Sequence, residues 1–316
     1  MDKDNIAVSV IVPVHNAEKY LYDTMESLVH QSMKNIEILC IDNGSTDDSV
    51  KILLEYEKVY PNVTVYTQTD HGQAYSMNRG LRLARGEYVA ECDSDDFVQL
   101  RMYEKLYEVA EHKADVVRCG FYGLWDTGFI QPNVLNVPEQ YMKVNPQELK
   151  GIAQSVVFGK MCSLFTGIYR RQFLLDNELF WREGKNYEDT CLEFKIKASA
   201  TDYRFLNECL YYYRRGNEGS GSATIKDEFA ICEQYDEIRA FDKDGKFADY
   251  MNSLMYYSYL WSLSRTPEER KFAFVEKMEA DFKLHPGKRK YFNNDADWAN
   301  YCTIRLGDWR EVGVKA

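Results

Sequence analysis

The chain has 316 residues, of which 45% are hydrophobic and 28% are charged, and its formal net charge is -11. This length favours two domains, or one large domain with an appendage. The strong negative charge disfavours nucleic acid as a partner, since binding to its phosphates relies on Lys and Arg. The apolar run at residues 7–14 is too short to cross a bilayer.

Residues 1–5 lack the basic start and the long apolar core of a secretory signal peptide. The eight cysteines include no Cys-x-x-Cys pair, and Cys40, Cys92 and Cys119 lie inside apolar segments. We therefore expect reduced thiols in core positions. Together these features predict a cytoplasmic protein, and contact with the inner face of the plasma membrane stays open.

The first third of the chain alternates between strand-like and helix-like segments. The strand-like apolar runs cover 8–14, 36–41, 63–66 and 88–92. Helical patterns separate these runs over 21–28, 50–54 and 73–85. Asn16 is expected to cap the first of these helices. Strands separated by helices predict an α/β fold with a mostly parallel sheet and right-handed crossovers.

Beyond residue 96 the pattern is less regular. The expected elements are helices over 102–112 and 187–197, a strand over 115–119 and one or two strands within 203–213. Residues 123–147 contain Gly, Pro and Asn without periodicity and are predicted to form a long loop.

The region after residue 224 changes to a helical pattern. A helix is expected over 227–241, and an apolar stripe follows at Met251, Leu254, Met255 and Trp261. Thr266 and Pro267 precede two glutamates, a pattern typical of a helix start with Thr266 as the cap. We therefore predict a catalytic domain over 1–224 and a helical C-terminal region over 225–316. The stripe is expected to pack on the catalytic domain, with a homodimer through the C-terminal helices as the alternative.

The most informative segment is the acidic run from Glu91 to Asp96, which directly follows the apolar residues 88–90. Ligands of open α/β sheets bind at the carboxyl ends of the strands. Crowded carboxylates repel one another unless a cation shares them, and hard oxygen ligands suit Mg²⁺, Mn²⁺ or Ca²⁺. The alternative is an acidic, solvated turn, since Asp and Ser favour turns.

Two further acidic positions complete the pattern. Asp42 ends the second predicted strand, so it should lie at the same sheet edge as the acidic run. Glu188 and Asp189 open a later helix, where one of them could act as a base. Each has a simpler explanation, because Asp42 suits an Asx turn and acidic residues favour a helix N-terminus.

The chain resembles family-2 inverting glycosyltransferases, which have the GT-A (Rossmann-like) fold, over about residues 6 to 224. The segments that carry the resemblance are Val8–Leu21, Ile41–Ser49, Asn78–Leu81, Ala84–Tyr88, Asp93–Asp96, Tyr187–Thr190 and Tyr212–Arg214, with Ser220 after the last. Their common order and spacing make the resemblance specific, although each motif alone is weak.

The resemblance implies a role for each matching residue. The nucleotide-sugar-binding residues would be Pro13, Val14, Asn16, Glu18, Asp42, Asn78, Asp93, Ser94 and Arg214. Asp42 would accept a hydrogen bond from the uracil imide, which implies a UDP-sugar donor. Asp95 would hold Mn²⁺ or Mg²⁺ against the diphosphate. Asp189 would be the general base, with Glu188 beside it in the Glu-Asp catalytic motif.

The implied reaction moves a sugar to a hydroxyl of a glycan or lipid-linked acceptor, in synthesis of a bacterial capsule or lipopolysaccharide. A carboxylate would take the hydroxyl proton while the metal stabilises the leaving diphosphate. One departure concerns Ser76-Met77-Asn78, where family members often have Ala-Arg-Asn. This chain therefore lacks one basic residue, which Arg79 or Arg82 could replace.

Two other functions stay open at this point. A sugar-nucleotide nucleotidyltransferase would also use metal-binding aspartates, but it would normally have a Gly-rich basic loop where this chain has 13–17. A non-catalytic scaffold or glycan-binding protein could keep the same fold. The basic-aromatic segment Lys288–Phe292 is either a solvated loop or a point of peripheral membrane contact.

Overall fold

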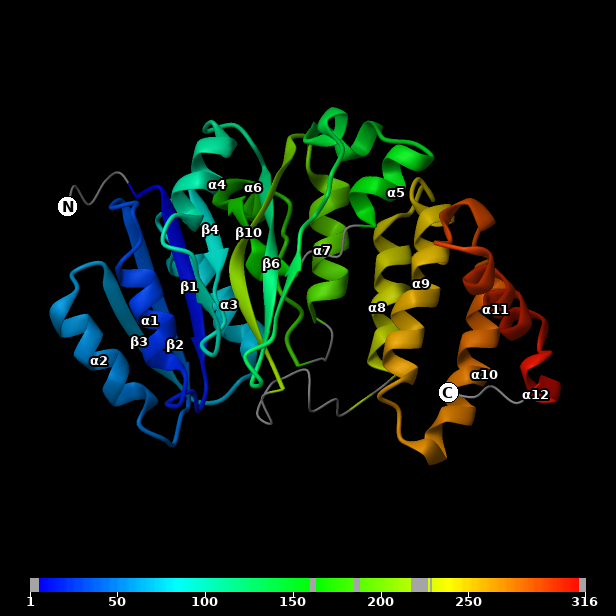
Figure 1. Cartoon of the computed structure of the whole chain (residues 1–316), viewed down its shortest axis with the longest axis horizontal. Coiled ribbons are helices and arrows are strands. Elements are labelled where there is room, and N and C mark those ends of the chain that lie inside the picture. The colour runs from blue at the N-terminus through cyan, green and yellow to red at the C-terminus, as the bar shows by residue number, and fades with distance from the viewer. Residues whose placement is uncertain (1–5, 160–162, 185–187, 217–226, 228, 313–316) are drawn as a thin grey trace. The chain divides into compact units, whose positions relative to one another are not determined.

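The computed structural model describes residues 6–159, 163–184, 188–216, 227 and 229–312 (Figure 1). The chain divides into two compact units. Unit 1 comprises Met1–Leu149, Lys160–Gly184 and Leu192–Glu218, and unit 2 comprises Lys150–Gly159, Lys185–Cys191 and Gly219–Ala316. The predicted boundary at 224/225 stays a prediction.

Unit 1 contains one sheet. Its strands are β1 (Val8–Val14), β2 (Ile36–Asn43), β3 (Val63–Gln68), β4 (Tyr88–Glu91), β5 (Phe97–Val98), β6 (Val116–Trp125), β7 (Ile130–Asn133), β8 (Lys143–Val144), β9 (Gly167–Arg170) and β10 (Tyr203–Arg215). The helices of this part of the chain are α1 (Leu21–Val29), α2 (Ser49–Val59), α3 (Gln73–Leu83), α4 (Met102–Ala110), α6 (Arg171–Asp176) and α7 (Glu188–Ser199), of which α7 begins in unit 2.

The strand order is β3-β2-β1-β4-β9-β6-β10-β5, with β7 beside β6 and β8 beside β10. The pairs β1–β2, β1–β4, β2–β3 and β6–β10 are parallel. Strand β9 lies antiparallel between β4 and β6, so the second half of the sheet is mixed. The predicted α/β class is confirmed, and the parallel arrangement is clearest in the first four strands.

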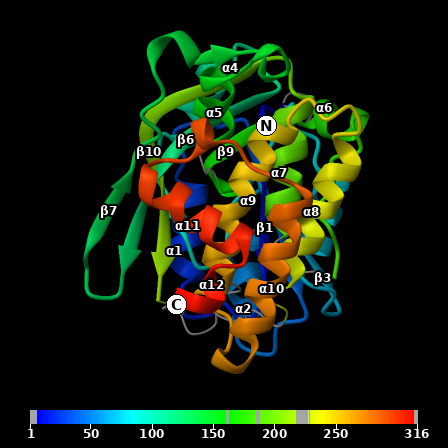
Figure 2. The same ribbon diagram turned by 90° about the vertical axis from the view of Figure 1, so that its right-hand side faces the viewer.

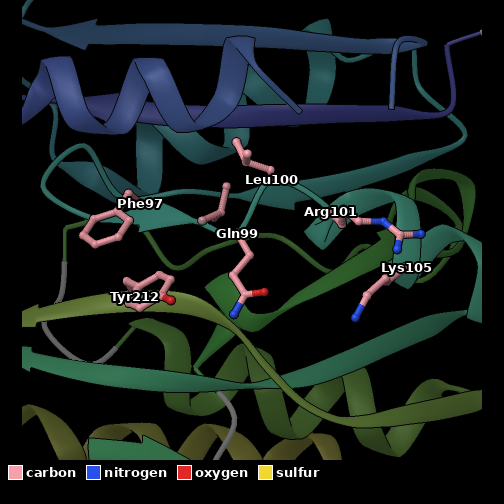
Figure 3. A pocket seen from close by; sticks show the side chains of 7 residues that line it. Phe97, Gln99, Leu100, Arg101, Lys105 and Tyr212 are labelled. Atoms are coloured by element: carbon pink, nitrogen blue, oxygen red, sulfur yellow. The ribbon is translucent and has the colours of Figure 1, made fainter. Parts of the chain in front are cut away.

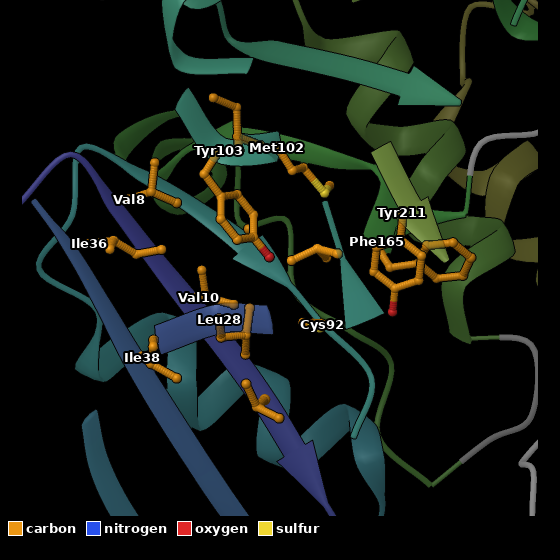
Figure 4. Packing of buried hydrophobic residues seen from close by; sticks show 14 of the residues in the cluster. Val8, Val10, Leu28, Ile36, Ile38, Cys92, Met102, Tyr103, Phe165 and Tyr211 are labelled. Atoms are coloured by element: carbon orange, nitrogen blue, oxygen red, sulfur yellow. The ribbon is translucent and has the colours of Figure 1, made fainter. Parts of the chain in front are cut away.

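The burial of the first strands on both faces of the sheet explains why the sequence predicts them. Every residue of β1 and β2 is buried, because helices cover both faces of the parallel part of the sheet. Val8, Val10, Ile36 and Ile38 join the core with Leu28 of α1 (Figure 4). A continuous apolar run is the sequence signature of such a doubly covered strand.

Two local expectations for unit 1 were wrong or incomplete. Tyr20, not Asn16, precedes α1, because Asn16 has a φ of 51° and its side chain bonds to Thr46. The predicted loop 123–147 contains the end of β6 and the short strands β7 and β8. The expectation of one or two strands within 203–213 is confirmed, because these residues lie in one strand with register shifts between Leu206 and Tyr211.

Unit 2 is helical. Its elements are α5 (Ile152–Phe158), α8 (Ala230–Phe241), α9 (Ala248–Leu263), α10 (Glu268–Leu284), α11 (Asp295–Leu306) and α12 (Trp309–Val312). Helices α8, α9 and α10 lie side by side (Figure 2). Thr266 donates its hydroxyl to the Ser262 carbonyl oxygen rather than capping α10, whose preceding residue is Pro267.

The predicted apolar stripe of α9 divides between core and surface. Met251 and Met255 are buried within unit 2, whereas Trp261 is 40% exposed. Within the described residues, no helix is long and apolar enough to span a bilayer. The cysteines that the structure describes are free thiols, and Cys162 lies outside the described residues.

Helix α3 approaches β1 closely at Gly80. A methyl group added there would lie 2.4 Å from Cγ2 of Ile11, a buried side chain of β1. Ile11 is β-branched and surrounded by core, so it cannot rotate away at low cost. Glycine at this position therefore sets the distance between the sheet and the helix that carries Gln73 and Asn78.

We expect Gly80→Ala to lower the free energy of unfolding by about 1–3 kcal/mol, the usual cost of overpacking. Urea denaturation of the full chain measures this change. The double variant Gly80→Ala/Ile11→Ala should be less destabilised than the sum of the two single variants, because the smaller side chain makes room for the methyl group. Strictly additive losses would contradict the close contact.

In unit 2, Glu279 connects α10 to the last helix. Its carboxylate accepts hydrogen bonds from Lys283 Nζ at 2.5 Å and from Trp309 Nε1 at 2.8 Å, and it pairs with Arg310. These bonds, with that from Lys283 the strongest, lower the pKa of Glu279 from 4.5 to about 2. The carboxylate therefore stabilises the folded state above about pH 4.5, and this contribution is lost as the pH falls towards 2.

Glu279→Gln should reduce the free energy of unfolding by roughly 1 kcal/mol at pH 7, because charged partners lose their acceptor. The difference from wild type should shrink between pH 4.5 and 2.5, measured by thermal unfolding at each pH. Glu276→Gln is the matched control, since Glu276 also pairs with Arg310 but is half exposed. An equal loss in both variants, or a pH-independent difference, would refute this role.

Candidate active site

The carboxyl ends of β1, β2 and β4 bring the predicted donor-site residues to one edge of the sheet in unit 1. Asp42 of β2 lies opposite Val14 in the parallel register, and Pro13 lies opposite Ile41. Strand β4 ends at Glu91, and the next amide, that of Cys92, donates to the Ile11 carbonyl oxygen of β1. The acidic run therefore lies at the carboxyl end of β4, as predicted, and the structure places β4 next to β1.

Asp42 is buried and bonds to its own exit turn. Its carboxylate accepts hydrogen bonds from the amides of Gly44 and Ser45, each at 3.3 Å. This is the Asx-turn geometry that the sequence left as an alternative. A carboxylate has about four acceptor positions, so this turn and a ligand contact are compatible.

The loop after β1 is fastened to the loop after β2. Asn16 Oδ1 accepts from the Thr46 amide at 2.8 Å, and the Asn16 amide donates to Ser45 Oγ at 3.0 Å. Glu18 accepts from the Asp48 amide at 2.9 Å. Asn16 and Glu18 therefore shape the rim around Asp42, and both are exposed.

Residues Asp93–Asp96 form the acidic turn, in which the Asp96 amide donates to the Asp93 carbonyl oxygen. Asp96 anchors this turn from inside the protein. Its buried carboxylate accepts from the Tyr211 hydroxyl at 2.9 Å and from the Arg214 amide at 2.7 Å. Its carbonyl oxygen accepts from Thr24 Oγ1 of α1 at 2.6 Å. Burial raises the pKa of Asp96 well above its usual range, and the charges of Asp93 and Asp95 raise it further.

The other members of the turn, Asp93, Ser94 and Asp95, are half-buried. Asp93 Oδ1 accepts from Gln73 Nε2 at 2.9 Å, and the Asp93 amide donates to the Tyr211 hydroxyl at 3.1 Å. Ser94 contributes its carbonyl oxygen, which accepts from Thr24 Oγ1 at 2.9 Å. Gln73 also donates to Glu91 at 3.2 Å, so one amide group joins two carboxylates.

Arg214 of β10 lies against this turn. Its Nη1 donates to the Asp95 carbonyl oxygen at 2.8 Å, and its Nη2 pairs with Asp23 of α1 at 2.5 Å. A groove of about 440 Å³ follows the turn, lined by Phe97, Gln99, Leu100, Arg101, Lys105 and Tyr212 (Figure 3). Its two cations pair with Glu104 and Glu208, so the groove has little net charge.

The carboxylates of the acidic turn fit a divalent cation that a bound substrate would also help to hold. In the described part of the chain, no three His, Cys, Asp or Glu side chains are arranged to hold a metal ion by themselves. Mg²⁺ is usually bound by one or two carboxylates together with substrate phosphates and water. Asp95, with Asp93 two residues away, offers such a set, and the repulsion that acts on Asp96 is what a cation would relieve.

Asn78 occupies a different place from the other predicted donor-site residues. Its buried carboxamide donates to the Trp181 carbonyl oxygen and to Glu183, both at 2.8 Å, and accepts from the Trp181 amide at 2.9 Å. These bonds engage both ends of the carboxamide, so Asn78 holds the segment around Trp181.

The predicted catalytic pair lies at the start of α7, in unit 2. Glu188 is the first residue of the helix, and its side chain lies outside the described residues. Asp189 is exposed. The structure therefore gathers the acidic turn, Asp42 and Arg214 in unit 1, and it places Asp189 in the other unit.

Three residues that bond to the acidic turn were not predicted from the sequence: Thr24, Gln73 and Tyr211. Thr24 and Gln73 lie in helices whose polar residues look like ordinary surface positions. Tyr211 is the first of three tyrosines that directly precede Arg214, a residue that was predicted. The sequence shows at most a polar or aromatic residue near a motif, and this does not indicate which residue of the acidic turn it bonds to.

Solved glycosyltransferase structures have the same fold. The structure of residues 1–349 of Staphylococcus aureus TarS, solved with UDP-GlcNAc, matches with a TM-score of 0.71 and 20% identity, over 96% of this chain and 92% of that one. The mannosyltransferase PcManGT from Pyrobaculum calidifontis, solved with GDP-Man and Mn²⁺, matches with a TM-score of 0.56 and 14% identity, over 99% and 88%. At these identities the likeness concerns the fold alone.

The sequence comparisons identify the family. Glycosyltransferase GlyG of Streptococcus pneumoniae serotype 4 is 31% identical, over 75% of this chain and 78% of its own length. Three other relatives of equal identity are matched over 60% of their length. The family model described as "Glycosyl transferase family 2" matches residues 9–171, which include β1, Asp42 and the whole acidic turn. The chain therefore belongs to glycosyl transferase family 2 and is a glycosyltransferase.

Proposed function

We propose that this glycosyltransferase moves a sugar from a UDP-sugar to a hydroxyl group of a glycan or lipid-linked acceptor, with inversion and with help from Mn²⁺ or Mg²⁺. The observation that carries the proposal is the acidic turn, held by the buried Asp96 at the sheet edge where Asp42 also lies. A UDP-sugar is favoured because TarS, which shares the fold, was solved with UDP-GlcNAc.

In this proposal the donor lies along the carboxyl edge of β1, β2 and β4. Pro13, Val14, Asn16 and Glu18 form the rim beside Asp42, which accepts from the base. Asp93 and Ser94 lie on the ribose side. Arg214 faces the diphosphate, where a guanidinium forms charge-assisted hydrogen bonds with phosphate oxygens. Asn78 acts indirectly, by fixing the segment around Trp181.

The cation would be held by Asp95, with Asp93 close by. When bound, it supplies positive charge that neutralises the diphosphate as it leaves. The proposal is supported by the Mn²⁺ in the PcManGT structure and by the donor set of the turn. The net charge of -11 makes this compensation more necessary, since the protein as a whole repels a nucleoside diphosphate.

Asp189 is proposed as the general base. It takes the proton of the acceptor hydroxyl as that oxygen forms a bond to the anomeric carbon. The bond from this carbon to the diphosphate oxygen breaks with its electron pair going to UDP. One displacement inverts the anomeric configuration, and no covalent nucleophile on the protein is needed.

The proposed pathway is synthesis of a bacterial surface polysaccharide such as capsule or lipopolysaccharide. One relative, 28% identical, is the poly(ribitol-phosphate) β-N-acetylglucosaminyltransferase TarS. The proposed location is the cytoplasm, at the inner membrane face where lipid-linked acceptors reside. Lys288 and Arg289 pair with Asp249 and Asp295, which reduces the positive charge available to lipids. A homodimer through the C-terminal helices also stays a proposal.

We expect UDP to bind the wild-type protein in the presence of Mn²⁺, measured by calorimetry with and without the metal. Asp95→Asn should weaken this metal-dependent binding at least tenfold, about 1.4 kcal/mol, because the amide is a poorer cation ligand. Glu108→Gln, an exposed change on α4, is the control and should bind like wild type. Metal-independent binding, or equal affinity in all three proteins, would refute the role of Asp95.

Asp189→Asn should lower kcat by about 10²- to 10⁴-fold and change the UDP affinity less than twofold, since a base acts on the acceptor. UDP release from UDP-glucose, UDP-galactose and UDP-GlcNAc, each with a glycan acceptor mixture, gives the rate. Glu188→Gln is the matched neighbour and separates the two acids of the motif. Activity retained in Asp189→Asn but lost in Glu188→Gln would reverse the assignment.

A further inference from the structure

The Arg214 side chain lies close to two aromatic rings. Its guanidinium carbon is 4.9 Å from the ring centroid of Tyr20 and 5.0 Å from that of Phe97. The Arg214 side chain is 12% exposed, although it belongs to the polar edge of the sheet. Both rings come from segments next to the proposed donor site, since Tyr20 precedes α1 and Phe97 directly follows Asp96.

The position of Phe97 is determined by strand register. In the antiparallel pair β5–β10 it lies opposite Tyr212, and their rings stack at 4.6 Å with an interplanar angle of 13°. Figure 3 shows these two rings facing one another. Tyr212 lies opposite Tyr122 of β6, and this second pair stacks at 4.9 Å and 19°. Arg214 is two residues beyond Tyr212, so both side chains point to the same face of β10.

This arrangement restricts a long and flexible side chain. A free arginine side chain populates many rotamers and loses this conformational entropy when it is fixed. The quadrupole of an aromatic ring attracts a cation on its face, and this attraction grows when water is excluded. Rings at 4.9 and 5.0 Å and hydrogen bonds at both Nη atoms therefore restrain the guanidinium before any ligand arrives.

The two side-chain hydrogen bonds of Arg214 differ in how easily a ligand could replace the acceptor. The bond from Nη1 to the Asp95 carbonyl oxygen joins the arginine to the acidic turn. The bond from Nη2 goes to Asp23, whose side chain is 65% exposed. Exposed ion pairs contribute little and are screened by solvent, so an anionic ligand can take the place of Asp23.

We propose that Tyr20 and Phe97 are positioning residues that hold the Arg214 guanidinium ready for the diphosphate of the donor, with Asp23 as its partner until the diphosphate binds. This inference rests on the proposed function, because it needs a nucleoside diphosphate at the acidic turn. It adds a preorganised arginine to that site, and preorganisation lowers the entropy cost of binding.

Phe97 provides the cleaner test, because the Tyr20 ring also contacts Lys19 at 4.7 Å. Calorimetry in Mn²⁺ compares UDP with uridine, which has the same base and ribose but no phosphate. Phe97→Leu should weaken UDP binding roughly 3- to 30-fold, the range that a cation–π contact corresponds to, and leave uridine binding unchanged. Phe97→Tyr keeps a ring and should restore UDP affinity to within twofold of wild type.

Two further comparisons separate positioning from packing. Tyr122→Leu removes a similar stacked ring that does not contact Arg214, so it should not change the ratio of UDP to uridine affinity. In an Arg214→Gln background, Phe97→Leu should have no further effect on UDP binding. If Phe97→Leu does not fold, judged by its thermal midpoint, Phe97→Met makes the same comparison with a flexible apolar side chain.

The inference is overturned if Phe97→Leu weakens UDP and uridine equally, if Tyr122→Leu acts in the same way, or if the effect persists without Arg214. Absence of UDP binding by the wild-type protein would instead refute the uridine donor of the proposed function. The same series with GDP and ADP then decides the inference, because the arginine is proposed to face the diphosphate and not the base. A nucleoside diphosphate that binds equally to wild type and Phe97→Leu overturns it.

Discussion

The geometry of the proposed donor site depends on one buried carboxylate, that of Asp96. It accepts hydrogen bonds from the Tyr211 hydroxyl and the Arg214 amide of β10, while its own carbonyl oxygen accepts from Thr24 of α1. Three segments that are far apart in the sequence therefore meet at one residue. A buried carboxylate is costly unless its acceptors are satisfied, so this turn has little freedom to take another shape.

The aspartates of the acidic run differ in burial and therefore in role. Asp96 is fully buried and structural, whereas Asp93 and Asp95 are half-buried. Their charges act on Asp96 and raise its pKa, so the turn is under electrostatic repulsion while no cation is bound. A site built in this way favours ligands that bring positive charge, such as a divalent cation with a diphosphate. The same logic applies to Arg214, whose positive charge lies within an acidic protein and beside the Asp95 carbonyl.

The relatives and the family model identify the family, the solved structures share the fold, and the substrates are left to experiment. The family match extends over β1, Asp42 and the acidic turn, to which the proposed function assigns the nucleotide-sugar donor. Residues beyond the match include α7, with Asp189, and Arg214 of β10. The proposed base and one of the proposed donor-site residues therefore lie outside the part of the chain that the family model matches. A nucleotidyltransferase would need a basic loop after β1, and here that loop contains Asn16 and Glu18, bonded to the loop after β2.

The sequence alone determined the features that depend on local pattern. Buried parallel strands are largely apolar runs, so β1, β2 and β4 were predictable, and the acidic run at the end of β4 indicated the proposed donor site. The tertiary structure decided what depends on distant partners. Asn78 bonds to Trp181, Gln73 to Asp93, and Thr24 to Asp96, and no periodicity links residues that are 20 to more than 100 positions apart. The antiparallel β9 between β4 and β6 was hidden for the same reason, because strand pairing is set by register between segments and not within one.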